Sequence, residues 1–140
     1  MDRNLTGNYF VRALRPAFHD ARKWLPRTKD RAELRGHSLK LRFWPGKRPD
    51  DETGALLDLD WSWIKSLPGK RVGELRVNDT IGGCDNLRII FFDPGISGKP
   101  MPTIWILAVL QKKQDDFSKA QIKNFALRRT LVLERFYNEA

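Results

Sequence analysis

Sulfur, histidine and long apolar runs are all scarce in this sequence of 140 residues. It contains 1 cysteine, Cys84, and 2 histidines, His19 and His37. One thiol cannot close an internal disulfide, and a thiol far from both imidazoles in sequence does not have the spacing of zinc ligands. Apolar runs such as residues 103–110 are far shorter than the ~20 residues that cross a bilayer. These absences predict a cytoplasmic protein without a membrane segment, a metal or a cofactor.

Basic residues are in excess. The chain has 26 Lys and Arg against 17 Asp and Glu, a net charge of +9 and a pI near 10.1. Residues 1–50 carry 13 basic and 5 acidic residues, and residues 101–140 carry 7 and 4. This balance favours an anionic partner, although Lys and Arg also solvate helix faces in many proteins. A hydrophobic content of 41% predicts a packed domain rather than a disordered chain.

The N-terminal zone has the spacing of helices. Apolar residues recur there one, three or four positions apart, with arginine and lysine between them. Pro16 and Pro26 should interrupt the pattern, because proline removes a backbone donor and crowds the preceding turn. Thr28 is placed to cap a second short helix that Gly36 ends. We therefore expect residues 1–36 to form a basic helical N-terminal extension, followed by a second unit over residues 37–140.

The middle of the chain predicts one strand, one loop and one helix. Leu, Leu and Phe alternate with polar residues over Ser38–Trp44, which is typical of a half-buried strand. The segment Pro45–Gly54 is polar and rich in breakers, and should be a surface loop. A short helix is expected from Asp58 through Trp61 and beyond, ending at Pro68-Gly69.

Three strand-like runs then precede a final helix. The runs are Arg71–Val77, Leu87–Phe92 and Thr103–Leu110, and their close spacing predicts an antiparallel meander. The last two are apolar on both faces, so they should be central and covered by helices. Ser118 and the glutamine three residues later form a capping-box pattern before a helix that runs to about Tyr137. The expected fold class is α+β, with N-terminal helices, a small mostly antiparallel sheet and a C-terminal helix.

Four basic residues fall in or at the ends of the meander: Arg76, Arg88, Lys112 and Lys113. Neighbouring antiparallel strands lie ~4.8 Å apart, so side chains on one face can converge on one phosphate. Arginines within apolar strands need an anion, which can be a ligand or an internal partner. An ion pair between Glu74 and Arg88 is the internal alternative.

A basic cluster without acidic metal ligands suits RNA cleavage by transfer to the ribose 2′-hydroxyl. That reaction needs a base, an acid and charge stabilisation, and no metal. A lysine crowded by other cations can serve as the base, with Lys112 and Lys113 as the candidates. The same two lysines are also compatible with a solvated strand end. Tyr9 and Tyr137 are further acid or base candidates, although both residues can equally serve packing.

Other chemistry-bearing residues favour structural or solvent-exposed roles. His19 and His37 show no partner at helical spacing that would make a catalytic or metal pair. Asp58 and Asp60 are interpreted as part of a solvated acidic loop. Cys84 lies in a glycine-containing connection with nothing nearby in sequence to activate its thiol.

The order of the motifs resembles a known family. The runs Gly73–Arg76, Leu87–Phe92 and Ile106–Lys113, followed by Phe117-Ser118 and a helix, are similar to the RelE/ParE superfamily of bacterial toxins. The branch it looks most like is phage-derived and HigB-like, with a Glu-Leu-Arg strand, an Arg-hydrophobic strand and a strand ending in two lysines. The resemblance covers roughly residues 55–137.

What the resemblance implies is a RelE-like fold and the toxin of a type II toxin-antitoxin system. Such toxins usually act as ribosome-dependent mRNA endoribonucleases and are held inactive by a cognate antitoxin protein. The expected partners are therefore the antitoxin and mRNA on the ribosome. The resemblance further implies catalysis by Arg88, Lys112 and Lys113, and RNA binding by Arg76, Arg128 and Arg129.

The chain departs from the family pattern in two ways. It carries about forty additional N-terminal residues, and it has no histidine in the predicted sheet or last helix. The base would therefore be a lysine or a tyrosine. ParE-type relatives share the fold but act on gyrase and cut no RNA. A gyrase-directed toxin and a non-catalytic, prophage-derived protein that binds nucleic acid or an antitoxin are the alternatives.

Overall fold

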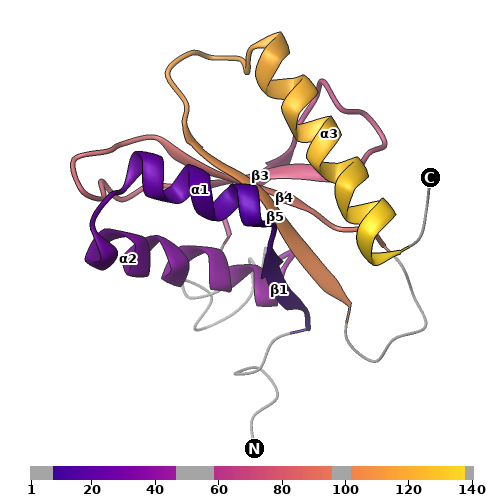
Figure 1. The fold of residues 1–140 in the computed structure, drawn as a ribbon, viewed down its shortest axis with the longest axis horizontal. Coiled ribbons are helices and arrows are strands. Elements are labelled where there is room, and N and C mark those ends of the chain that lie inside the picture. The colour runs from indigo at the N-terminus through magenta and orange to yellow at the C-terminus, as the bar shows by residue number, and fades with distance from the viewer. Residues whose placement is uncertain (1–7, 47–58, 96–101, 138–140) are drawn as a thin grey trace, which may run out of the picture.

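A five-stranded mixed sheet organises the chain, with helices on both faces (Figure 1). The computed structural model describes residues 8–46, 59–95 and 102–137. Within them the elements are β1 (Phe10–Ala13), α1 (Arg15–Trp24), α2 (Thr28–Ser38), the 3₁₀ helix η2 (Leu39–Phe43), β2 (Trp61–Trp63), β3 (Val72–Val77), β4 (Leu87–Phe92), β5 (Thr103–Gln111) and α3 (Lys119–Phe136). The strand order is β1-β5-β4-β3-β2. The α+β class is therefore confirmed.

The meander β3-β4-β5 forms where the apolar runs predicted it. Both pairings are antiparallel, with Arg76 opposite Arg88 and Arg88 opposite Leu110. In β4 every residue except Arg88 is buried, as expected for a strand covered on both faces. The partner of β4 jumps from Ala108 to Ile106 between Ile90 and Phe91, so Leu107 is an extra residue in β5. This bulge changes which N–H and C=O groups of β5 point toward the edge on the side of β1.

The expected helix over the first apolar residues is wrong in part. Phe10–Ala13 form β1, which pairs in parallel with residues 103–106 of β5. Helical spacing in so short a segment does not exclude a strand, and the open edge of β5 offers backbone partners. Pro16 does not interrupt a helix, because it lies in the first turn of α1, where a missing N–H costs nothing.

The second helix differs from its prediction at both ends. Arg27 is the N-cap residue and makes no side-chain capping bond, so Thr28 is not the cap. Helix α2 also continues past Gly36 to Ser38, and the predicted boundary between residues 36 and 37 falls inside it. A glycine needs a left-handed conformation to end a helix in the usual way, and Gly36 keeps the helical one.

Two further predictions for the middle of the chain are wrong. The expected strand Ser38–Trp44 is the end of α2 followed by η2, in which only Leu41 is buried. The expected helix from Asp58 is replaced by β2, whose Trp61 and Trp63 pair with β3. Aromatic residues alternating with serine favour an edge strand once β3 is available. Asp58 itself and most of the predicted loop Pro45–Gly54 lie outside the described residues.

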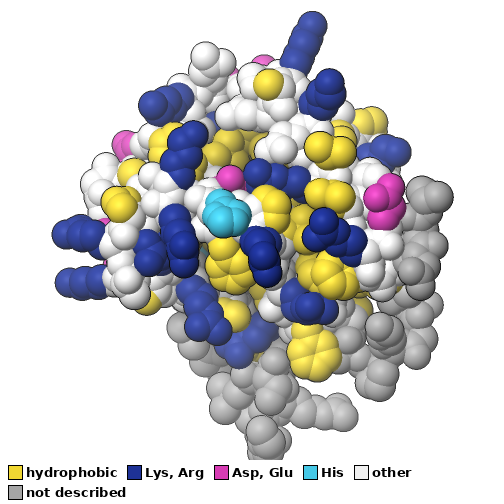
Figure 2. All heavy atoms as spheres, in the orientation of Figure 1, with side chains coloured by type: hydrophobic (Ala, Val, Ile, Leu, Met, Phe, Trp, Pro, Cys, Tyr) yellow, Lys and Arg dark blue, Asp and Glu magenta, His cyan; other side chains and the backbone are white. Residues whose placement is uncertain are grey.

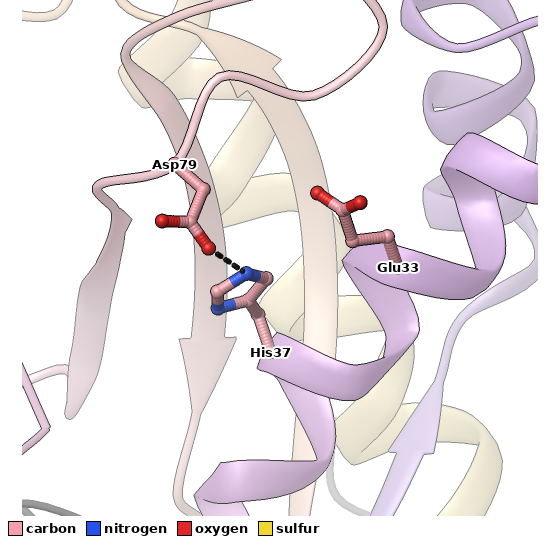
Figure 3. A group of neighbouring side chains, drawn as sticks. All are labelled: Glu33, His37 and Asp79. Carbon is pink, nitrogen blue, oxygen red and sulfur yellow. Dashed lines mark ion pairs between the residues drawn. The ribbon is translucent and has the colours of Figure 1, made fainter.

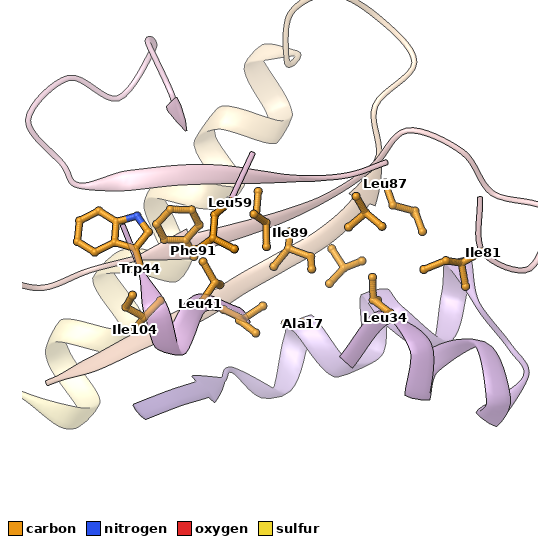
Figure 4. Packing of buried hydrophobic residues seen from close by; sticks show 14 of the residues in the cluster. Ala17, Leu34, Leu41, Trp44, Leu59, Ile81, Leu87, Ile89, Phe91 and Ile104 are labelled. Carbon is orange, nitrogen blue, oxygen red and sulfur yellow. The ribbon is translucent and has the colours of Figure 1, made fainter. Parts of the chain in front are cut away.

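The core has two layers, one on each face of the sheet. Helices α1 and α2 and the η2 segment cover one face, where Ala17, Leu34 and Leu41 contact strand residues such as Ile89 and Phe91 (Figure 4). Helix α3 covers the other face, where Phe125 and Val132 are buried against β4 and β5. The predicted helical cover of the central strands is confirmed.

The predicted capping box of the last helix is confirmed. The Gln121 N–H donates to Ser118 Oγ at 3.1 Å, and the Ser118 N–H donates to Gln121 Oε1 at 2.8 Å. These bonds satisfy two of the backbone donors that a helix N-terminus leaves open. Among the described residues, no helix combines the length and the apolar character needed to cross a membrane.

Gly73 is where a small side-chain change should be costly. A Cβ added there would lie 2.6 Å from Cζ of the fully buried Phe91 ring. We predict that Gly73→Ala lowers the free energy of unfolding by about 1–3 kcal/mol, because the ring cannot move aside without a rearrangement of the core. Urea unfolding followed by tryptophan fluorescence measures this loss.

The matched control is Gly36→Ala within α2. Apart from the backbone of α2 itself and the two neighbouring residues, no heavy atom lies within 4 Å of a Cβ there, so the substitution should raise helix stability by about 0.5–1 kcal/mol. If the two substitutions change stability equally, the contact between Gly73 and Phe91 does not constrain the sheet.

Candidate functional site

Three of the predicted basic residues gather at one end of the sheet, on the face that α3 covers elsewhere. Arg76 and Arg88 are cross-strand partners, so their side chains share a face. Glu74 is two residues before Arg76 and opposite Ile90, which belongs to the core beneath α3. Lys112 follows the end of β5, and its N–H donates to the carbonyl of Asn86 at 2.9 Å. The meander therefore positions these side chains.

Glu74 is the centre of this group. Arg88 Nε lies 3.0 Å and Lys112 Nζ 3.8 Å from the same oxygen, Glu74 Oε1. The three side chains are 8%, 15% and 17% exposed for Glu74, Arg88 and Lys112. A carboxylate so far removed from water needs cationic partners, and it has two. The internal Glu74–Arg88 ion pair, which the sequence left open, is present.

Arg76 extends the group toward solvent. Its guanidinium donates to Asp60 Oδ1 and to Ser62 Oγ, both at 3.0 Å, and its side chain is 32% exposed. Asp60 also accepts from Asn78 Nδ2 at 3.4 Å. Asp60 is therefore an ion-pair partner, beyond the solvated loop residue expected from the sequence. We call Glu74, Arg76, Arg88 and Lys112 the sheet-end cluster.

The structure does not bring Lys113 into the sheet-end cluster. Its ammonium lies 6.0 Å from the ring centre of Trp24 in α1, whereas the ammonium of Lys112 lies 4.6 Å from the ring centre of Phe117. Consecutive residues in extended backbone point to opposite sides, which separates the two lysines. Only one of the two contacts Glu74 among the described residues.

The two predicted arginines of α3 have separate surroundings. Arg129 Nε donates to the carbonyl of Lys70 at 2.8 Å, and its guanidinium lies 4.9 Å from the ring centre of Phe92. Arg128 donates to Asp20 Oδ2 at 2.6 Å and to the carbonyl of Leu107 at 2.9 Å. Arg128 thus ties α3 to α1 and to β5, and neither arginine contacts the sheet-end cluster.

A carboxylate between two cations can do acid-base chemistry on a phosphodiester. The carboxylate can accept a proton from a hydroxyl, while the cations stabilise negative charge that develops on phosphate oxygens. The sequence interpretation treated Glu74 only as an ion-pair partner. Its position in the Glu-Leu-Arg strand, two residues from Arg76 on the same face, was the signal for a wider role.

A second group contains the histidine that seemed to lack a partner. Glu33 precedes His37 by four residues on α2, and Asp79 approaches from the connection after β3 (Figure 3). His37 Nε2 lies 3.1 Å from Asp79 Oδ2. Glu33 lies on the same helix face as His37, because the two residues are four positions apart, and the sequence interpretation did not consider this spacing.

One face of the molecule is strongly basic. In Figure 2, Lys and Arg side chains outnumber acidic ones and lie among exposed hydrophobic side chains. The large exposed hydrophobic residues of the described chain include Phe10, Phe18, Leu127 and Phe136. A surface of this kind attracts polyanions and offers apolar contacts.

No family model, curated protein or solved structure matches this chain. The arrangement of the residues is therefore what the functional argument rests on.

Arg128 should be needed for stability. We predict that Arg128→Met lowers the free energy of unfolding by about 1–3 kcal/mol, because the Leu107 carbonyl and Asp20 both lose a charged donor. Arg129→Met is the matched control: it removes one exposed hydrogen bond and the contact with the Phe92 ring but leaves no carboxylate without its partner, so it should cost less than Arg128→Met, about 1 kcal/mol. Equal losses in urea unfolding would contradict a special role for Arg128.

Proposed function

We propose that this chain is an RNA-cleaving toxin of the RelE/ParE type, regulated by a cognate antitoxin protein, with the sheet-end cluster as its reacting site. The observation that carries the proposal is the carboxylate of Glu74 held between Arg88 and Lys112. The motif order that resembles the toxin family implies roles for three residues of this cluster, Arg76, Arg88 and Lys112. Cleavage of mRNA on the ribosome is the corresponding activity.

The proposed reaction transfers the phosphodiester to the ribose 2′-hydroxyl. Glu74 accepts the 2′-hydroxyl proton, and the 2′ oxygen attacks phosphorus. Arg88 and Arg76 stabilise the charge on the phosphate oxygens. The bond to the 5′ oxygen breaks, and that oxygen takes a proton from Lys112. The products are a 2′,3′-cyclic phosphate and a 5′-hydroxyl, and the proton on Glu74 can return to the neighbouring Lys112.

This assignment gives the base role to Glu74 in place of a lysine. In the resting structure Lys112 and Arg88 both face the carboxylate of Glu74. A carboxylate is then the group ready to accept a proton, and Lys112 the group ready to give one. Arg76 is the most exposed of the four and is suited to the first contact with a phosphate.

The charge distribution supports an RNA partner. The net charge of +9 and the basic face raise the local concentration of a polyanion and speed its association. The same forces act on any nucleic acid, so they support binding more strongly than they support cleavage.

A second candidate function is binding without catalysis. It is favoured by the internal partners of the arginines: Glu74 for Arg88, Asp60 for Arg76 and Asp20 for Arg128. Arginines already neutralised by protein carboxylates stabilise the fold whether or not a phosphate arrives. Under this alternative the exposed basic face, and not the sheet-end cluster, contacts an antitoxin or a nucleic acid.

The two candidates predict different results in a reconstituted translation system. With purified protein added, primer extension on a translated message should reveal new ends within the reading frame. Glu74→Gln and Lys112→Ala should each lower the cleavage rate at least about 10²-fold, because each removes a proton-transfer group. Lys113→Ala is the matched control and should leave the rate nearly unchanged, because its ammonium lies against Trp24.

The folding of each variant must be checked separately, because Glu74 is also one partner of a buried ion pair. Near-ultraviolet circular dichroism and RNA binding at several salt concentrations test each variant. A folded Glu74→Gln protein that still binds RNA but no longer cuts it supports the proposed base. Intact message with the unchanged protein, or equal loss in the Lys112 and Lys113 variants, would refute the assignment.

A further inference from the structure

The group of Glu33, His37 and Asp79 has the composition of a metal site. One imidazole and two carboxylates each offer a ligand atom, and these atoms all lie within 4.8 Å of one another (Figure 3). We propose that these residues bind one divalent transition-metal ion, with zinc as the best match to a mixed nitrogen and oxygen set. The observations for this metal site do not rest on the proposed RNA cleavage.

Local structure sets two of the three ligands in place. Glu33 and His37 are four residues apart on α2, so one helix turn presents both to the same side. The His37 ring is 17% exposed, and its Nε2 already faces Asp79 Oδ2 at 3.1 Å. A ring held this way keeps one nitrogen directed at the position an ion would take.

A rotation of the Glu33 side chain can bring the three ligand atoms to coordination distance. Ligand bonds of about 2.0–2.2 Å place neighbouring donor atoms of a tetrahedral ion roughly 3.5 Å apart. The His37–Asp79 separation is already shorter than this, and Glu33 is exposed and free of the core, so rotation of its side chain can close the set. Three protein ligands leave a coordination position for water.

A cavity beside the group gives an ion access to His37 and Asp79, whereas a nearby lysine opposes binding of the ion. A cavity of about 200 Å³ adjoins His37 and Asp79 and is also lined by Lys40, Asp60 and Arg76. Lys40 Nζ lies 3.4 Å from His37 Nδ1. When Nε2 binds a metal, Nδ1 carries the ring proton, so Lys40 can no longer donate to it. The ammonium must therefore turn away, and its charge opposes the cation.

Metal binding would join two separate parts of the fold. Glu33 and His37 belong to α2, whereas Asp79 belongs to the connection between β3 and β4. A bound ion therefore links the N-terminal helices to the meander and should raise the melting temperature, since it binds the folded chain in preference to the unfolded one.

The test uses the full-length chain carrying Cys84→Ser, so that no thiol competes for metal. Zinc chloride titrated into chelator-treated protein should give one binding event per chain by calorimetry, and a higher melting temperature. Cobalt(II) added to the same protein should give visible absorption bands of a bound ion with nitrogen and oxygen ligands. Absence of both heat and bands would overturn the proposal.

Single substitutions assign the ligands. His37→Gln, Glu33→Gln and Asp79→Asn should each weaken zinc binding at least about tenfold, because each removes a ligand. His19→Gln is the matched control and should bind as tightly as the parent. Lys40→Met should bind more tightly, because an opposing charge is gone. Loss of binding in the His19 variant but not in the His37 variant would place the zinc elsewhere and refute the site.

Discussion

The outer edge of β5 imposes the constraint on which the fold depends. Among the described residues, strand β1 pairs only with residues 103–106, and no other described strand lies beside the second half of β5 on that side. Two side chains take its place: Asp20 of α1 accepts from the Val109 N–H at 3.1 Å, and Arg128 of α3 donates to the Leu107 carbonyl. Because Asp20 and Arg128 also pair with each other, one ion pair closes the strand edge and fastens the helices of both faces to it.

The bulge explains why the two side chains are needed at that point. The extra residue Leu107 breaks the regular alternation of β5 and turns backbone groups toward the edge that β1 has just left. A partnerless carbonyl or N–H beneath two helices would be costly, so charged side chains from those helices satisfy it. Arg128 is thereby committed to the fold. A role in RNA binding, expected from the family resemblance, would require it to leave both Asp20 and Leu107.

Sequence patterns predicted the elements whose conformation is set by their own residues. They were misleading for short segments whose conformation depends on the elements packed beside them. Strands β4 and β5 are apolar on both faces and the last helix carries its own capping box, so these elements followed from local residues. The conformations of β1, η2 and β2 are set by the strand edges and helices beside them. These segments are too short for their hydrophobic periodicity to distinguish a helix from a strand. The same division holds for the site. Strand register places Arg76 and Arg88 together. Lys112 and Lys113 are consecutive residues and point to opposite sides, toward Phe117 and Trp24, which the sequence interpretation did not take into account.

The sheet-end cluster and the group of Glu33, His37 and Asp79 lie close to each other at the end of β3. Arg76 belongs to the sheet-end cluster, and Asp79 three residues later faces His37, yet both line the same cavity with Asp60. Glu33 was visible in the sequence from its helical spacing to His37, but Asp79 comes from a distant connection and only the folded chain brings it near. A divalent ion at His37 would neutralise Glu33 and Asp79, leaving Asp60 as the acidic group of the shared cavity. The local field around Arg76 would then become more positive, which favours a phosphate at the exposed side of the sheet-end cluster.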